Sequence, residues 1–186
     1  MLLLLACTGA SDDTGSFSDT EPPAPGEFAL SLPAATSSDG NELADRCGFV
    51  LSSDYECYNA NPEVRWENAP SGTAAFALIL DDPDAGDFDH WAVANIPADA
   101  TGLDAGISGQ DVESGLPSGA YEFENGFGFT GYLGSCPPEP HVYRWRVWAL
   151  SEALEEGLTG FDQVERKAAA TMLGEAETCH IYGPRL

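Results

Sequence analysis

The stretch FALILDDPDAGDFDHWAVANIP, residues 76–97, holds two short apolar runs on either side of an acid-rich loop. The runs, 76–81 and 90–96, are bounded by clusters of proline, glycine and aspartate, a pattern typical of β-strands. Apolar runs at 28–32 and 142–150 predict further strands. Long connections rich in glycine and proline separate the runs. The sequence therefore predicts a mainly β domain with antiparallel β-sheets packed as a sandwich.

Two helices are expected after the last of these strands. Residues 151–158 can form a short helix with Ser151 as its N-cap, and residues 161–174 a longer one that stops at Gly174. The stretch at 114–140 is expected to be mostly loop. A loop of that length in a compact domain usually has a function.

The composition narrows the kinds of partner. The chain has 186 residues, which suits one domain, and it carries 31 acidic against 7 basic side chains, a net charge of −24. A field of that sign repels nucleic acid and anionic lipid surfaces, so neither is expected as a partner. The charge fits a saline habitat, where salt screens self-repulsion, and equally a surface kept soluble.

The first residues, MLLLLACTGAS, resemble the start of a bacterial lipoprotein. Residues 1–6 are interpreted as a truncated signal peptide and Cys7 as the residue that carries the lipid, with a chance cysteine after leucines as the alternative. Residues 7–26 have the composition of a flexible acidic linker, and the folded domain is expected at 27–186. The sequence thus predicts an exported lipoprotein of the cell envelope, periplasmic or at the outer membrane, which contacts the membrane through its lipid anchor only.

Four further cysteines lie in the expected domain: Cys47, Cys57, Cys136 and Cys179. An even number in an exported protein indicates two disulfides, with three possible pairings. The expected pairs are Cys47–Cys57, a short local loop, and Cys136–Cys179. Zinc is the rival interpretation, but no C-x-x-C or H-x-x-x-H spacing occurs, so no metal site is predicted.

The acid-rich loop raises the question of a calcium site. An EF-hand counted from Asp82 fails, because glycine and valine occupy its positions 5 and 12. A looser calcium site from Asp84, Asp87 and Asp89 stays open as an alternative.

Nucleophilic catalysis is a second alternative. Ser135 and His141 lie close together in the sequence, and Asp82 with His90 could complete a hydrolase-like set. No G-x-S-x-G motif surrounds Ser135, so no catalytic residue is predicted.

An anion pocket is the third interpretation of the same residues. A protonated histidine offers two N–H donors, and a buried aspartate beside His90, such as Asp82, would raise its pKa and fix its tautomer. Backbone N–H groups of Gly134, Ser135 and Cys136 could then hold phosphate or carboxylate oxygens. A lone histidine is more often a core residue whose hydrogen bonds are satisfied. The hypothesis therefore depends on the histidine, the aspartate and the backbone N–H groups lying together.

Two motifs, DPDAGDFDHWAVANIPAD at 82–99 and GYLGSCPPEPHVYRWRVWAL at 131–150, resemble the phosphatidylethanolamine-binding protein family, in its bacterial Raf-kinase-inhibitor-like branch. Weaker matches extend the resemblance over about residues 28–185. It implies two antiparallel β-sheets, C-terminal helices and a small surface pocket for phosphate-like or carboxylate groups, and no cofactor is expected. By matching position, the implied pocket residues are Asp82, His90, Pro138, His141 and Tyr143, with backbone groups from Gly134, Ser135 and Cys136.

Three residues depart from the family pattern. Gly86 replaces a proline, Val142 replaces the arginine of an H-R-Y motif, and His180 stands where glycine is usual. The segment from Cys47 to Cys57 lengthens a loop that is shorter in many relatives. These departures bear on the identity of the ligand more than on the fold.

The sequence therefore predicts a non-enzymatic, membrane-tethered binding module for a small anion or a phospholipid head group. In this hypothesis Asp82 orients His90, and His141 supplies the second polar arm. The alternative is a protein-interaction or inhibitor module for a kinase or protease as its protein partner. Such a partner would contact either the long loop at 109–140 or the pocket.

Overall fold

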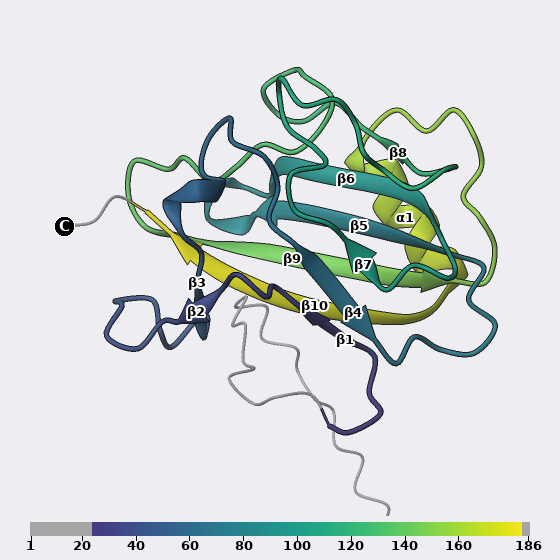
Figure 1. Cartoon of the computed structure of the whole chain (residues 1–186), viewed down its shortest axis with the longest axis horizontal. Helices are drawn as coiled ribbons and strands as arrows, with labels where there is room; N and C mark the ends of the chain where they lie inside the picture. The colour runs from purple at the N-terminus through teal and green to yellow at the C-terminus, as the bar shows by residue number, and fades with distance from the viewer. Residues whose placement is uncertain (1–23, 184–186) are drawn as a thin grey trace, which may run out of the picture.

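The structure is a computed structural model and describes residues 24–183. In this part of the chain it is mainly β, with two sheets and one α-helix, which confirms the predicted fold class (Figure 1). The elements are β1 (Ala29–Ser31), β2 (Thr36–Ser37), β3 (Phe49–Val50), the 3₁₀ turn η1 (Ser53–Tyr55), β4 (Val64–Glu67), β5 (Ala75–Asp82), the 3₁₀ turn η2 (Pro83–Ala85), β6 (Phe88–Pro97), β7 (Gly102–Leu103), β8 (Tyr121–Glu122), β9 (His141–Leu150), α1 (Phe161–Thr171) and β10 (Met172–Tyr182).

The two sheets differ in size. The large sheet has the strand order β2-β3-β10-β9-β5-β6-β8, and the small sheet has the order β1-β4-β7. Neighbouring strands are antiparallel, apart from β3 and β10, which are parallel.

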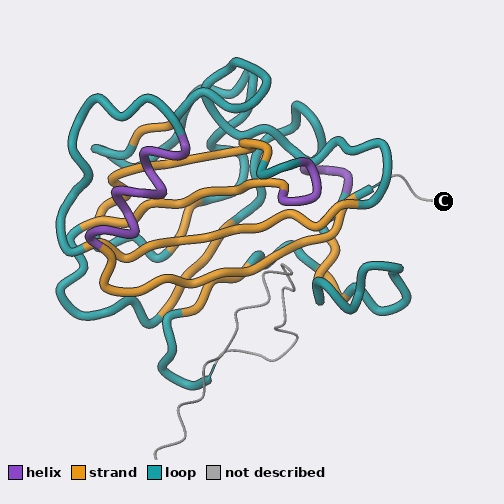
Figure 2. Tube along the Cα trace, turned by 180° about the vertical axis from the view of Figure 1, so that it is seen from behind, coloured by secondary structure: helices purple, strands orange, loops and turns teal. Residues whose placement is uncertain are grey.

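β5 lies inside the large sheet, between β9 and β6, and all eight of its residues are buried. One of its faces carries Phe76, Leu78 and Leu80, which pack in a core shared with the small sheet. The other face carries Ala77 and Ile79, which pack in a core shared with α1. The small sheet lies in front of the large sheet in Figure 1, and α1 comes to the front in the reverse view of Figure 2. Because both faces are covered, the strand is apolar along most of its length, and its sequence signal is strong.

The C-terminal segment differs from the prediction. The helix α1 ends at Thr171 instead of Gly174, and the next eleven residues form the strand β10. β10 pairs with β9 along its length, down to Tyr182 opposite His141. Alanine, methionine, leucine and glutamate favour a helix locally, but pairing with β9 outweighs that propensity here. The expected C-terminal helices are therefore one helix followed by a strand.

The short helix predicted at 151–158 was also wrong, because this segment consists of bends and turns. The Asn95 side chain binds both backbone groups of Leu154: its Oδ1 accepts from the N–H at 2.8 Å, and its Nδ2 donates to the carbonyl at 3.0 Å. These are the groups that a helix would use for its own hydrogen bonds. Gly157 also has a φ of 87°, which lies outside the helical region.

All four cysteines of the domain form disulfides, but both expected pairs are wrong. Cys47 is bonded to Cys179, with a Cα–Cα distance of 5.9 Å. The cause is the parallel pairing of β3 with β10, which places Val50 opposite Ile181. That register brings Cys47, two positions before the start of β3, alongside Cys179, two positions before Ile181.

The second disulfide joins Cys57 to Cys136, with a Cα–Cα distance of 4.9 Å. The Cys57 N–H donates to the Ser135 carbonyl at 3.1 Å, and the Gly134 N–H donates to the Cys57 carbonyl at 2.7 Å. This short backbone ladder holds the two cysteines together, although 79 positions separate them in the sequence. The spacing of the cysteines in the sequence gave no indication of this backbone ladder.

Several predictions concern residues outside the described part of the chain. Cys7, the proposed signal peptide at 1–6 and most of the proposed linker at 7–26 lie there. Among the helices at residues 24–183, none has both the length and the apolar character needed to cross a membrane.

Candidate functional site

The predicted site residues gather at one end of the large sheet. Asp82 is the last residue of β5, His90 lies near the start of β6, and His141 is the first residue of β9. Because these strands are antiparallel neighbours, the end of β5 and the starts of β6 and β9 meet at the same edge. His180, near the end of β10, lies opposite Tyr143 at this edge.

A β-bulge sets the direction of His90. Leu80 is opposite Trp91 and Asp81 is opposite Asp89, so His90 is one extra residue on β6. An extra residue re-aims the side chains of a strand, and bulges are common beside functional sites. His90 packs edge-on against Tyr143, with ring centroids 5.1 Å apart, on the face that carries Asp82.

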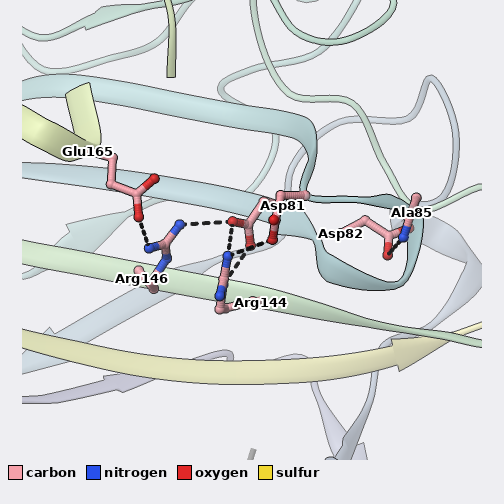
Figure 3. Close-up of polar contacts among 7 residues, drawn as sticks. Asp81, Asp82, Ala85, Arg144, Arg146 and Glu165 are labelled. Carbon is pink, nitrogen blue, oxygen red and sulfur yellow. Dashed lines mark hydrogen bonds and ion pairs between the residues drawn. The ribbon is translucent and has the colours of Figure 1, made fainter. Parts of the chain in front are cut away.

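The aspartate at this site contacts a different histidine from the one predicted. His141 Nδ1 donates to Asp82 Oδ2 at 2.7 Å, so Asp82 orients His141 and not His90. The other oxygen, Oδ1, accepts from the Ala85 N–H at 3.1 Å and caps η2, as Figure 3 shows. Asp82 is 3% exposed, which agrees with its predicted inward direction.

His90 is held by the backbone instead. Its Nδ1 lies 2.9 Å from the Leu133 carbonyl oxygen, which only accepts, so Nδ1 carries the proton and donates. Burial lowers the pKa of His90, outweighing the opposing effects of the Leu133 hydrogen bond and the Asp82 charge. Asp82 acts in the expected direction, but burial outweighs it, so the pKa of His90 falls instead of rising.

In both histidines Nδ1 is used, and Nε2 has no hydrogen-bond partner among the described residues. The one fully enclosed side-chain nitrogen or oxygen without a partner in this part of the chain is Nε of Arg146, which lies elsewhere. The Nε2 atoms of His90 and His141 are therefore open to solvent or to a ligand. They accept hydrogen bonds when the ring is neutral and donate when it is protonated.

Tyr143 lies between the histidines of the site. Its ring stacks on His180 with centroids 4.9 Å apart, and it is 6.3 Å from the ring of His141. Burial, followed by the negative charge of Asp82, raises the pKa of Tyr143 above its ordinary range. Its phenol therefore keeps its proton at physiological pH.

His180 stands where the family pattern has glycine, and the structure shows what it does. Trp145 Nε1 donates to His180 Nδ1 at 2.8 Å, so the proton of the neutral ring is on Nε2. That Nε2 donates to Ser135 Oγ at 2.9 Å. Burial lowers the pKa of His180 to about 3, so the ring stays neutral and the direction of this chain of bonds is fixed.

The direction of these hydrogen bonds argues against the hydrolase alternative. A general base must offer a lone pair to the serine hydroxyl, but His180 presents N–H to Ser135. His141, the base considered from the sequence, is bonded to Asp82. Ser135 is 2% exposed, and no histidine lone pair in the described residues is hydrogen-bonded to its hydroxyl.

The segment from Gly134 to Pro138 contributes less than predicted. The Gly134 N–H is already bonded to the Cys57 carbonyl, so it is not free for an anion. A Cβ on Gly134 would lie 2.1 Å from the Tyr55 carbonyl oxygen, which explains the glycine by close packing. Pro138 is exposed on the same segment.

Two other aspartates of the loop, Asp84 and Asp87, are paired with arginines. Asp84 contacts Arg46 at 2.7 Å, and Asp87 contacts Arg144 at 3.1 Å. Asp89 is half-buried, and burial, followed by the charge of Asp162, raises its pKa to about 6. Within residues 24–183, no group of three acidic, histidine or cysteine side chains is arranged to hold a metal ion.

Asp81 belongs to a separate network on the opposite face of β5. It accepts from Arg144 Nε at 2.9 Å and from Arg146 Nη2 at 2.8 Å, and Arg146 also pairs with Glu165 of α1 (Figure 3). Sequence reasoning did not single out this network. The signal was present, because the alternation in 142–150 places both arginines on one face.

Two surface hollows lie elsewhere: one of about 310 Å³ at the start of α1, and one of about 800 Å³ beside the end of β10. His90 and His141 line neither of them.

Comparison with known proteins identifies a family that the sequence matches. A family model described as phosphatidylethanolamine-binding protein matches residues 34–183. The UPF0098 protein YbcL of Escherichia coli is 42% identical over 98 residues, which are 50% of this chain and 53% of that protein, so the chain spans about half of it in this match. The putative lipoprotein LppC of Mycobacterium tuberculosis is 32% identical over 161 residues, covering 82% of this chain and 72% of that protein.

Solved structures agree with the sequence comparisons. The crystal structure of Escherichia coli YbcL, described as a new member of the mammalian PEBP family, has a TM-score of 0.72 at 28% identity. The match covers 86% of this chain and 99% of that chain. Both the sequence and the fold therefore place the chain in one family.

Proposed function

The chain belongs to the phosphatidylethanolamine-binding protein family, and from this premise we propose that it is a binding protein for a small anion or a phospholipid head group. The ligand would lie between His90 and His141, above the ring of Tyr143. No cofactor and no covalent chemistry are needed for this role.

One observation carries the proposal: both imidazoles are fixed through Nδ1 and leave Nε2 free. Asp82 fixes the ring of His141, and the Leu133 carbonyl fixes the ring of His90. When protonated, the two rings offer N–H donors to one anion, and these charge-assisted bonds are stronger than neutral ones. A local pair of donors can bind an anion although the net charge of the chain is −24.

A non-enzymatic role is part of the proposal. The Ser135–His180 pair supports it, because the histidine donates to the serine and cannot remove its proton in this tautomer. The same bonds fix Ser135 against His180, whose ring stacks on Tyr143 beneath the proposed ligand position.

We expect anion affinity to weaken as pH rises. Burial lowers the pKa of His90, so the free protein carries its proton only at low pH, and binding an anion must take up a proton. Uptake of one proton changes affinity by up to about tenfold per pH unit, with the tighter binding on the acidic side. Calorimetry with phosphate, phosphoethanolamine and sulfate at pH 5.5 and pH 8 measures this; sulfate keeps its charge over that range and isolates the protonation of the protein.

Two variants sharpen this experiment. His141→Ala removes one of the two side chains proposed to contact the anion and should weaken sulfate binding at pH 5.5 by about tenfold or more. Asp104 is exposed and follows β7 in the small sheet, whereas the histidines lie on the large sheet. Asp104→Asn should therefore leave the sulfate affinity unchanged. Equal sulfate affinity at the two pH values, or in His141→Ala and the parent, would contradict the proposed mechanism.

We also propose that the protein is tethered to a membrane through a lipid on Cys7. The support is the MLLLLAC start together with the relationship to a protein named a putative lipoprotein. Expression in a bacterium with its native upstream sequence should place the protein in the membrane fraction, and Cys7→Ser should release it to the soluble fraction. Equal partition of the two forms would argue against the tether.

A further inference from the structure

We infer that the ligand carries a flat, uncharged apolar group next to its anionic group, and that this apolar group lies on an aromatic surface beside the histidines. The inference rests on the proposed function and names the class of ligand, an aryl phosphate or aryl carboxylate. The surface, here called the aromatic shelf, consists of Phe88, Phe127, Tyr58 and Phe129.

The shelf begins at the site itself. The ring of Phe88 packs edge-on against His90, with centroids 5.3 Å apart. Phe127 follows at 5.5 Å from Phe88, and Tyr58 at 6.4 Å from Phe127. Phe129 lies 6.3 Å from Tyr58 and ends the row. An aryl ring bonded directly to an anion held by His90 therefore reaches the shelf without a spacer.

The shelf is exposed to an unusual degree. Phe127 is 58% and Tyr58 is 55% exposed. These are the two largest exposed fractions among the large hydrophobic side chains of residues 24–183. The two residues come from loops about 70 positions apart in the sequence, yet their rings are neighbours. Single exposed apolar residues are ordinary, but a contiguous group beside a polar site indicates a binding surface.

The loop that carries Phe127 is held in shape by Asn125. The Asn125 side chain accepts from the Phe127 N–H at 3.0 Å and donates to the Gly131 carbonyl at 2.9 Å. Its backbone N–H donates to the Phe129 carbonyl at 2.9 Å. Gly126 is required at this turn, because a Cβ there would lie 2.3 Å from the ring of Phe88. The loop thus presents Phe127 to solvent in a fixed position.

The loop that carries Tyr58 is fixed by the second disulfide. Cys57, the preceding residue, is bonded to Cys136, which follows Ser135 in the wall of the histidine site. The shelf and the site are therefore linked covalently and by backbone hydrogen bonds. Surfaces that are rigid before binding lose little conformational entropy when a ligand arrives.

Charge limits what the appended group can be. Glu56 and Glu124 lie on the two loops that carry the shelf, and Asp87 precedes Phe88. These carboxylates repel a second negative group at the shelf. The combination favours one anionic group with a neutral ring, and it disfavours ligands with several phosphates.

Calorimetry at pH 5.5 with the full chain tests this inference, using phenyl phosphate and inorganic phosphate as probes. We expect phenyl phosphate to bind about tenfold more tightly, because its ring adds aromatic contacts and buried apolar area that inorganic phosphate lacks. Phe127→Ser and Tyr58→Ser should each reduce this preference and leave phosphate affinity unchanged. Leu173→Ser is the matched control, because Leu173 is 43% exposed at the opposite end of the sheet.

The outcomes separate this inference from the proposed function. If neither probe binds, the proposed function fails. If both bind with equal affinity, or if the shelf variants keep the preference, the anion site stands and the aromatic shelf is not part of it. If Phe127→Ser instead abolishes capture by phosphatidylcholine vesicles or by a protein partner and leaves phenyl phosphate binding intact, the shelf serves a membrane or a protein, and the inference is overturned.

Discussion

Replacing Cys47 and Cys179 together by serine is expected to lower the free energy of unfolding by about 4–5 kcal/mol. The disulfide joins residues 132 positions apart, so its loss restores much conformational entropy to the unfolded chain. Both cysteines are also buried, at 2% and 7% exposure, so serine hydroxyls there would need new hydrogen bonds. Urea denaturation without reductant measures the difference.

The second disulfide provides the matched comparison. Cys57→Ser with Cys136→Ser should cost a similar amount, since that cross-link closes a loop of 79 positions. It should in addition weaken phenyl phosphate binding, because it loosens the loop that carries Tyr58, whereas the Cys47/Cys179 variant should not. Peptide mapping of the unreduced protein checks the pairing directly, and a peptide that links Cys47 to Cys57 would contradict it.

Asp81→Asn is expected to destabilise the protein by about 3–5 kcal/mol at pH 7. Asp81 is 3% exposed and is the shared partner of Arg144 and Arg146. An asparagine keeps the shape but not the charge, so two guanidinium groups would remain in and beside the core without their common carboxylate. Arg146 is the more affected, since its side chain is 9% exposed and retains only Glu165.

Asp104→Asn is the matched control for this experiment. Asp104 also pairs with an arginine, Arg65, at 2.6 Å, but its side chain is 75% exposed. Solvent screens such pairs, so we expect a loss below about 1 kcal/mol. Thermal or urea unfolding of both variants gives the comparison, and a loss for Asp81→Asn no greater than that for Asp104→Asn would show that the arginines find other partners.

These two faces of β5 explain why neighbouring aspartates have different roles. Asp81 and Asp82 are adjacent, so their side chains point to opposite sides of the sheet. Asp81 neutralises arginines beneath α1, and Asp82 orients His141 at the candidate site. The first role concerns stability, and the second concerns the ligand.

Much of the candidate site could be predicted from the sequence. The motifs around 82–99 and 131–150 pointed to Asp82, His90, His141 and Tyr143, and the structure brings these four residues together. The partner of Asp82 could not be predicted in the same way. It depends on a bulge at His90 and on the register between β5 and β9, and both arise from pairing between strands.

The role of His180 could not be predicted from the sequence either. The sequence marked it as a departure from the family pattern, without indicating a contact. His180 contacts Trp145 and Ser135 because β10 lies beside β9. The sequence did not predict β10, because part of its segment has residues that favour a helix.

The sequence by itself determined the β-rich class, the strands β5, β6 and β9 and the family, because apolar periodicity and motifs are local properties that residues carry wherever they lie. The tertiary structure alone decided the disulfide partners, the strand at the C-terminus, the histidine that Asp82 holds and the aromatic shelf. Each of these joins segments far apart in the chain. Such contacts form only where packing of the whole domain lowers the free energy, and local propensity does not report which segments will meet.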